Sequence, residues 1–165
     1  MEHPERVSFA DRVVLVCKRK DGSVKWKYDS KDDPKSKSMT AAGFAEVAGL
    51  IVADVGGTAF DYIAIGTGTT SPTPSDTALE AEVKRKAADG TRTSTVYTND
   101  TAKWVATFSS ADGLSGTDNI SELGVFNAAS GGVMLFRKTF TAKTISWDDG
   151  DTLEATATCQ MVQGT

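Results

Sequence analysis

The chain has 165 residues, of which 39% are hydrophobic and 24% are charged. A chain of this length and composition is too apolar to be disordered, and it can bury one core without a metal or a disulfide. Its formal net charge of −4 argues against a general nucleic-acid binder, because phosphate contacts require a positive surface. No run approaches the roughly 20 apolar residues that span a bilayer. The N-terminal residues lack the apolar stretch of a signal peptide.

The N-terminal part of the chain predicts an arm followed by a β-hairpin. Residues 1–11 are polar and mixed, which is typical of a segment that becomes ordered only against a partner. Two alternating runs over 13–29 then flank Asp21 and Gly22, the preferred pair for a two-residue type I′ turn. A charged loop over 30–38 follows the hairpin and interrupts the pattern of strands.

Residues 40–53 have the pattern of an amphipathic helix. Thr40 is a suitable N-cap residue, whereas Gly43 and Gly49 weaken a helix and make it depend on packing. Four apolar residues repeat with the i, i+3, i+4, i+7 spacing of one helix face: Phe44, Val47, Ala48 and Ile51. We therefore expect this face to lie against the core.

The middle of the chain predicts a strand, a loop and a second helix. A buried strand is expected over 60–65, and a loop rich in Gly, Thr and Pro comes after it. Thr77 and Glu80 have the spacing of a capping box, and two acid–base pairs four residues apart follow them. These local signals predict a short helix from about 77 to 86.

The C-terminal half predicts strands joined by polar turns, at roughly 92–98, 102–109 and 152–162 and in the pair ISELGVF and VMLFRKTF. If Phe126 pairs with Val133, the register of this pair places Glu122 opposite Arg137. We expect Glu122 to be partly buried, and a buried carboxylate needs a partner. The sequence therefore predicts an ion pair between Glu122 and Arg137.

These elements together indicate a mainly β protein with about eight strands and one or two short helices. The expected fold is an antiparallel β-sandwich or jelly-roll-like domain. We expect it to form a single domain over 12–165, preceded by the arm 1–11 and carrying the charged loop 30–38 as an insertion.

No segment supplies a recognisable catalytic or cofactor-binding motif. The glycine-rich run 66–68 lacks the Lys of a phosphate-binding loop, and the acidic turn 148–151 lacks the spacing of a calcium loop. His3 is the only histidine and lies in the arm, which argues against a Ser-His-Asp or Cys-His system. Cys17 and Cys159 fall in apolar runs and are expected to be buried thiols. We expect no enzyme activity, no cofactor and no metal.

Several of these segments, taken in order, resemble a known family. They are YIAIGTGTTSPTPSDTALEAEVKR, TNDTAKWVATF, ISELGVFNAASGGVMLFRKTF and GDTLEATATCQ. The most specific matches are Ile65-Gly66-Thr67-Gly68, Glu82 with Arg85, Glu122 with Gly124-Val125-Phe126-Asn127, and Gly131-Gly132 leading to Arg137. Over 12–162 the chain resembles small virion structural proteins of tailed bacteriophages, of the capsid decoration (cement) or tail-fibre/collar type.

The resemblance implies a non-enzymatic virion protein that is made in the host cytoplasm. We expect a capsid decoration protein, a homotrimer that stabilises the head by binding neighbouring major-capsid subunits, with no nucleic-acid or membrane partner. The candidates for partner contacts lie in the arm and the charged loop: His3, Pro4, Arg6, Phe9, Lys31, Lys35 and Lys37. A tail-fibre, collar or other tail module is the alternative, and a carbohydrate-binding β-sandwich is a third possibility.

Overall fold

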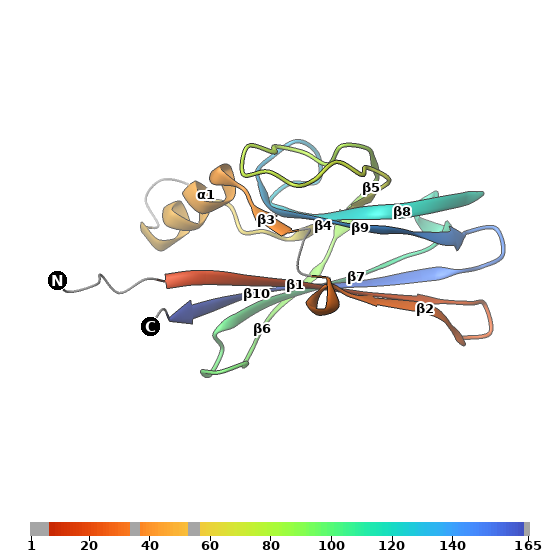
Figure 1. Cartoon of the computed structure of the whole chain (residues 1–165), viewed down its shortest axis with the longest axis horizontal. Helices are drawn as coiled ribbons and strands as arrows, with labels where there is room; N and C mark the ends of the chain where they lie inside the picture. The colour runs from red at the N-terminus through yellow and green to blue at the C-terminus, as the bar shows by residue number, and fades with distance from the viewer. Residues whose placement is uncertain (1–6, 34–36, 53–56, 164–165) are drawn as a thin grey trace.

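The computed structural model describes residues 7–33, 37–52 and 57–163 and shows a mainly β chain with one α-helix (Figure 1). The strands are β1 (Val7–Lys18), β2 (Val24–Asp29), β3 (Lys37–Met39), β4 (Tyr62–Gly66), β5 (Glu82–Ala87), β6 (Asp89–Thr93), β7 (Thr101–Phe108), β8 (Thr117–Phe126), β9 (Met134–Ser146) and β10 (Thr152–Gln163). The helix α1 spans Ala41–Val52, and two 3-10 turns are η1 (Ser30–Asp32) and η2 (Ser110–Asp112). The predicted antiparallel β-sandwich is confirmed, with ten strands in the described ranges rather than about eight.

The strands form two five-stranded antiparallel sheets, which lie as two layers in Figure 1. The first sheet has the order β2-β1-β10-β7-β6, and the second has the order β3-β9-β8-β4-β5. Because successive side chains of a strand point to opposite faces, each sheet turns one apolar row toward the other. The largest buried aromatic side chains of the core between the sheets are Trp147, Phe108 and Phe136.

The first strand begins earlier than the sequence suggested. The predicted arm extends to residue 11, but β1 pairs with β10 from Val7 opposite Gln163 to Lys18 opposite Thr152. Residues 7–11 are therefore part of the first sheet, because β10 offers a full-length partner for their backbone groups. The candidate contact residues His3, Pro4 and Arg6 lie outside the described residues.

The hairpin of β1 and β2 is confirmed, but its turn is of another type. Gly22 N donates to Arg19 O at 2.8 Å, and Arg19 N donates to Ser23 O at 2.9 Å. Gly22 has φ +83°, whereas Asp21 is not among the residues with positive φ. A type I′ turn needs two such residues, so the connection is a type I turn followed by a left-handed glycine.

The charged loop predicted over 30–38 contains two short elements. Ser30–Asp32 forms η1, where Lys31 is exposed. Lys37 begins the short strand β3, which pairs with β9 at the edge of the second sheet. Lys35 lies outside the described residues. The loop therefore carries the chain from the first sheet to the second.

The helix is found where predicted, but the face that it turns inward is different. Gly43 N donates to Thr40 Oγ1 at 2.8 Å, which confirms Thr40 as the N-cap. Gly43 and Gly49 are buried, whereas Phe44 is 46% exposed and Ile51 is 81% exposed. A Cβ on Gly43 would lie only 2.6 Å from Leu135 O of β9. The helix thus packs on the second sheet through glycine and turns much of its predicted apolar stripe outward.

The prediction of a second helix from about 77 to 86 is wrong. Residues 82–87 form β5, which pairs with β4 from Tyr62 opposite Ala87 to Gly66 opposite Glu82. The edge of β4 needs a hydrogen-bonding partner, and this demand outweighs the small gain of exposed acid–base pairs on a helix.

The register between β8 and β9 also differs from the prediction. Phe126 lies opposite Met134, and Gly124 lies opposite Arg137. Irregularities near Ile120 and between Val125 and Phe126 shift the pairing, and they could not be read from the alternation of residues.

Candidate functional site

A fully buried carboxylate lies at the centre of the outer face of the second sheet. Glu122 Oε2 accepts from Arg137 Nε at 2.8 Å, so the predicted ion pair is confirmed although the two residues are not directly opposite. Glu122 Oε1 accepts from Gly68 N at 2.9 Å and from Ala81 N at 2.8 Å. Glu80 N donates to the other oxygen at 3.1 Å. One side chain thus holds both ends of the loop between β4 and β5.

Arg137 extends this network into the middle of the same loop. Its Nη1 donates to Asp76 Oδ2 at 3.0 Å, and its Nη2 lies 3.5 Å from Glu80 Oε2. Glu80 Oε2 also accepts from Thr70 N at 2.8 Å and from Thr69 N at 2.7 Å, and these bonds lower the pKa of Glu80. Burial by itself raises the pKa of Asp76, but hydrogen bonds from Thr73 and Arg137 outweigh it and the pKa is lowered.

A second arginine fixes the turn between β8 and β9. Arg85 lies over the ring of Phe126, with its guanidinium carbon 3.5 Å from the ring centre. Its Nη1 donates to Ala128 O at 3.0 Å and to Gly131 O at 2.8 Å, and its Nη2 pairs with Glu82 at 2.6 Å.

The residues that carry the sequence resemblance lie in adjacent rows across the second sheet. One row runs from Arg85 through Ala64 and Gly124 to Arg137, and the next pairs Gly66 with both Glu82 and Glu122. Gly124 leaves the space that the Leu79 and Phe126 side chains occupy, since a Cβ there would approach both within about 3 Å. The arrangement fixes the loop between β4 and β5 and the turn between β8 and β9.

Sequence reasoning missed several members of this network. Asp76 and Glu80 contact Arg137 although they precede it by more than fifty residues, and Arg85 was grouped with a helix. The signal that could have found them is the run of glycines at 66 and 68, because a backbone without side chains can approach a buried carboxylate closely.

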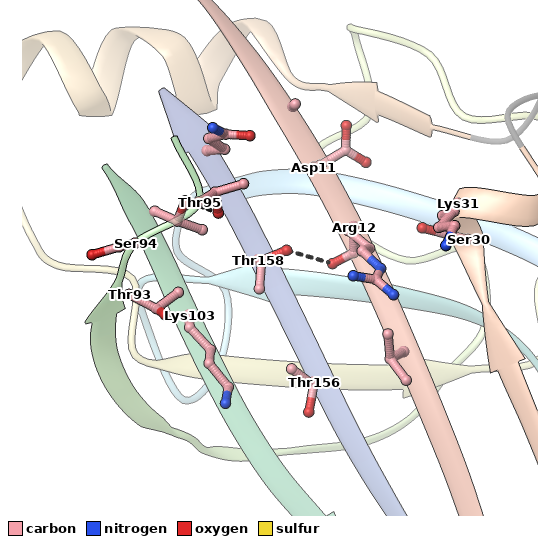
Figure 2. Close-up of a pocket in the computed structure, with 14 residues that line it drawn as sticks. Asp11, Arg12, Ser30, Lys31, Thr93, Ser94, Thr95, Lys103, Thr156 and Thr158 are labelled. Carbon is pink, nitrogen blue, oxygen red and sulfur yellow. Dashed lines mark hydrogen bonds between the residues drawn. The ribbon is translucent and has the colours of Figure 1, made fainter. Parts of the chain in front are cut away.

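A groove of about 540 Å³ opens on the outer face of the first sheet (Figure 2). Thr156 and Thr158 of β10 line its floor, with Arg12 of β1 on one side and Lys103 of β7 on the other. Lys31, one of the predicted contact residues, lies at its edge. The groove therefore offers hydroxyl groups flanked by positive charge.

The positively charged side chains of the groove differ in whether they form an ion pair. Arg12 donates through Nε and Nη2 to the two oxygens of Asp29 at 2.9 and 2.5 Å, which lowers the pKa of Asp29 to about 2. The ammonium groups of Lys31 and Lys103 make no ion pair or hydrogen bond within the described ranges. These two groups can attract carboxylates of another molecule.

Among the described residues that line the groove, none is a histidine or a cysteine. His3 lies outside the described residues, and the thiols of Cys17 and Cys159 are buried. Among the residues that the structure covers, no three His, Cys, Asp or Glu side chains converge as metal ligands. Asp151 of the acidic turn pairs instead with Lys25 at 2.5 Å.

At one end of the molecule, α1 lies beside the beginning of β1 and the end of β10 (Figure 1). Large apolar side chains of α1, β10 and the turn after β6 are exposed. We call this surface the apolar end. Its exposed members are Phe44, Leu50, Ile51, Val52, Val96, Tyr97 and Met161.

Contacts connect α1, the paired ends of β1 and β10, and the turn after β6 at the apolar end. The ring of Phe9 lies 5.7 Å from that of Phe44, and Phe9 is directly opposite Met161 in the first sheet. Met161 N donates to Asp100 O at 3.0 Å. The Asp100 carboxylate accepts from the amides of 95–97, which places Val96 and Tyr97 beside the strand end. Phe9 is the predicted contact residue that belongs to this surface.

No known protein family, curated protein or solved structure matches the chain. None of the helices in the described ranges is both long and apolar enough to cross a membrane.

Proposed function

We propose that this chain is a non-enzymatic structural protein of a tailed-phage virion, and that it decorates the capsid by binding neighbouring major-capsid subunits as a homotrimer. The proposal combines the sequence resemblance with one structural observation, the apolar end. A monomer that acts alone rarely exposes a large contiguous apolar patch, and such patches mark sites of interaction. A component that is buried among neighbours in a particle has a reason to expose one.

The pinned loops support a role in assembly. Glu122, Arg137 and Arg85 fix the loop after β4 and the turn after β8 through charged hydrogen bonds, of which the one between Arg137 and Glu122 is buried. A surface held in one conformation before binding loses less conformational entropy when it docks. Rigid loops around a β-sandwich therefore suit a protein that must fit the same site many times on one shell.

The groove is the surface that we assign to the shell. Lys31 and Lys103 present ammonium groups without partners in the described part of the chain, next to the hydroxyls of Thr156 and Thr158. Such a surface is complementary to carboxylates and polar groups of a capsid subunit. Charges at an interface contribute more to specificity and association rate than to affinity.

Cryo-electron microscopy of the purified virion tests the proposed function. We expect density for this chain at symmetry-related positions on the shell, in three copies per site. Density confined to the tail would contradict decoration and support a tail module, whereas absence of the chain from the particle would contradict a virion role altogether.

A binding experiment tests the assignment of the groove. Purified chain is added to expanded heads that lack it, and bound protein is measured after sedimentation. Lys103→Glu should reduce binding at least tenfold, because it places a carboxylate where we expect one of the partner's. Lys20→Glu is the matched control, since it makes the same charge change at an exposed turn outside the groove. Equal binding of the two variants would exclude the groove as the shell contact.

A further inference from the structure

We infer that the apolar end is the surface through which one copy of this chain binds another. The helix α1 provides the first argument. It carries one charged residue, Glu46, whose carboxylate accepts from Thr58 N at 2.6 Å and from Asn127 Nδ2 at 3.1 Å. Its charge is therefore engaged by the body of the molecule, and the exposed face of the helix is uncharged.

The shape of this exposed face suits contact with another apolar surface. Small side chains are exposed at Ala41, Ala45 and Ala48, and large ones project beside them at Phe44 and Ile51. Alternating small and large residues lets the projecting side chains of one surface enter the hollows of another. A mainly apolar helix is normally buried, but within the described residues α1 is covered mainly on the face that carries Gly43, Val47 and Gly49.

The size of the apolar end is that of a specific interface. Its seven large side chains are between 40% and 81% exposed. A large aromatic side chain presents roughly 150–250 Å² when free and an aliphatic one presents less, so the seven together present several hundred Å², which approaches the roughly 800 Å² that one partner buries in a standard interface. The free energy gained by burying this area would exceed the entropy lost on association only if the partner surface were also apolar.

Charge favours a second copy as the partner. Each chain has a formal net charge of −4, so two copies repel each other through most orientations. The exposed large side chains of the apolar end are uncharged, and the Asp100 carboxylate beside them is engaged by the amides of 95–97. The same residues supply an apolar surface on both partners, as a contact between identical chains requires.

This inference extends the proposed function, in which several copies act together, but it is tested on the isolated protein. Size-exclusion chromatography with light scattering gives the mass of the wild-type chain over a range of concentrations. We expect a multiple of the monomer mass of 17.4 kDa. A wild-type chain that stays monomeric at every concentration would overturn the inference.

Two matched variants identify the surface. Ile51→Lys places a charge in the apolar end and should reduce the mass to that of a monomer. Val24→Lys makes a similar change at a residue that is 56% exposed on β2, in another part of the surface, and should leave the oligomer intact. Because both side chains are exposed, both variants should keep the melting temperature that the wild-type chain has at dilutions where it is monomeric. An oligomer that survives Ile51→Lys, or is lost with Val24→Lys, would overturn the inference.

The outcomes separate this inference from the proposed function. A monomeric chain that still binds expanded heads would contradict self-association and leave decoration standing. An oligomer that depends on Ile51 but is absent from the virion would contradict decoration and leave the inference standing.

Discussion

Glu122 has no access to solvent and carries a charge that only protein groups can stabilise. Removing one partner of a buried ion pair leaves the other charge buried without a counter-charge. The stability lost in this way exceeds the stability that the pair adds relative to apolar side chains of similar volume. If Glu122 were replaced by Ala, Arg137 would still pair with Asp76 and Glu80. The amides of Gly68 and Ala81, however, would lose their hydrogen-bond acceptor.

We therefore predict that Glu122→Ala lowers the free energy of unfolding by about 3 kcal/mol. Urea unfolding followed by circular dichroism measures the change. Glu154→Ala is the control, because Glu154 and Lys18 form an exposed pair at 3.9 Å, which typically contributes at most about 1 kcal/mol. Equal stability of wild-type and Glu122→Ala would show that the loop between β4 and β5 is held by other contacts.

A second residue-scale prediction concerns acid. The hydrogen bond from Arg12, with smaller contributions from the Lys31 amide and nearby positive charge, lowers the pKa of Asp29 from 3.8 to about 2. A pKa lowered by folding contributes stability that is present above about pH 4 and lost as the pH falls toward 2. Because Arg12 is about half exposed, the contribution is on the order of 1 kcal/mol.

Asp29→Asn should flatten the dependence of stability on pH in this window. Urea unfolding at several pH values between about 4 and 2 measures the slope for each variant. Asp148→Asn is the matched control, because it makes the same replacement at an exposed carboxylate of the turn before β10. An unchanged slope for Asp29→Asn would mean that the ion pair with Arg12 does not contribute in solution.

At the scale of elements, α1 shows what the sequence could and could not predict. Its bounds and its N-cap followed from Thr40 and from helix periodicity. The face that α1 turns toward the core could not be predicted. Apolar residues occur on most sides of this helix, and periodicity cannot choose between two apolar faces. Gly43 decides the choice, since close approach of the β9 backbone leaves no space for a Cβ. Such an approach is a property of the folded chain that no local pattern records.

The packing of α1 on β9 can be tested with one methyl group. Gly43→Ala should gain about 1 kcal/mol from helix propensity. Its Cβ, however, would lie 2.6 Å from Leu135 O and 2.8 Å from Leu135 Cα. Backbone atoms cannot rotate away, and overpacking of this kind typically costs about 1–3 kcal/mol.

We therefore expect Gly43→Ala to lower the melting temperature. Gly90→Ala is the matched control, because its Cβ would meet nothing closer than Trp104 Cδ1 at 3.8 Å, an ordinary contact. A Gly43→Ala protein more stable than wild-type would show that α1 does not pack closely on β9.

The error at β5 has the opposite origin. Its capping-box spacing and acid–base pairs were real local signals, but each acid–base pair contributes only about 0.2–0.5 kcal/mol to a helix. Pairing with β4 satisfies a row of backbone groups at once, and Arg85 then reaches the turn after β8. Long-range pairing of this kind overrides local preference.

At the scale of the whole molecule, composition and alternation were enough to predict a single β-sandwich, because most strands turn one apolar face inward. They could not predict which surfaces remain open. The groove depends on the alignment of β1, β10 and β7, and the apolar end depends on which face of α1 is buried. Both are set by contacts between segments far apart in the chain.

The two thiols report on the opening of the whole molecule. Burial raises the pKa of Cys17 to about 11 and that of Cys159 to about 12, and both side chains are buried in the first sheet. The thiolate is the reactive form, so neither should react with a disulfide reagent in the native protein near pH 8. Both should become reactive together at the midpoint of urea unfolding, because β1 and β10 are paired over their full length.

A Cys17→Ala variant assigns the signal to Cys159. Labelling of Cys159 at urea concentrations below the transition would show instead that the paired ends of β1 and β10, beside the apolar end, open independently of the core.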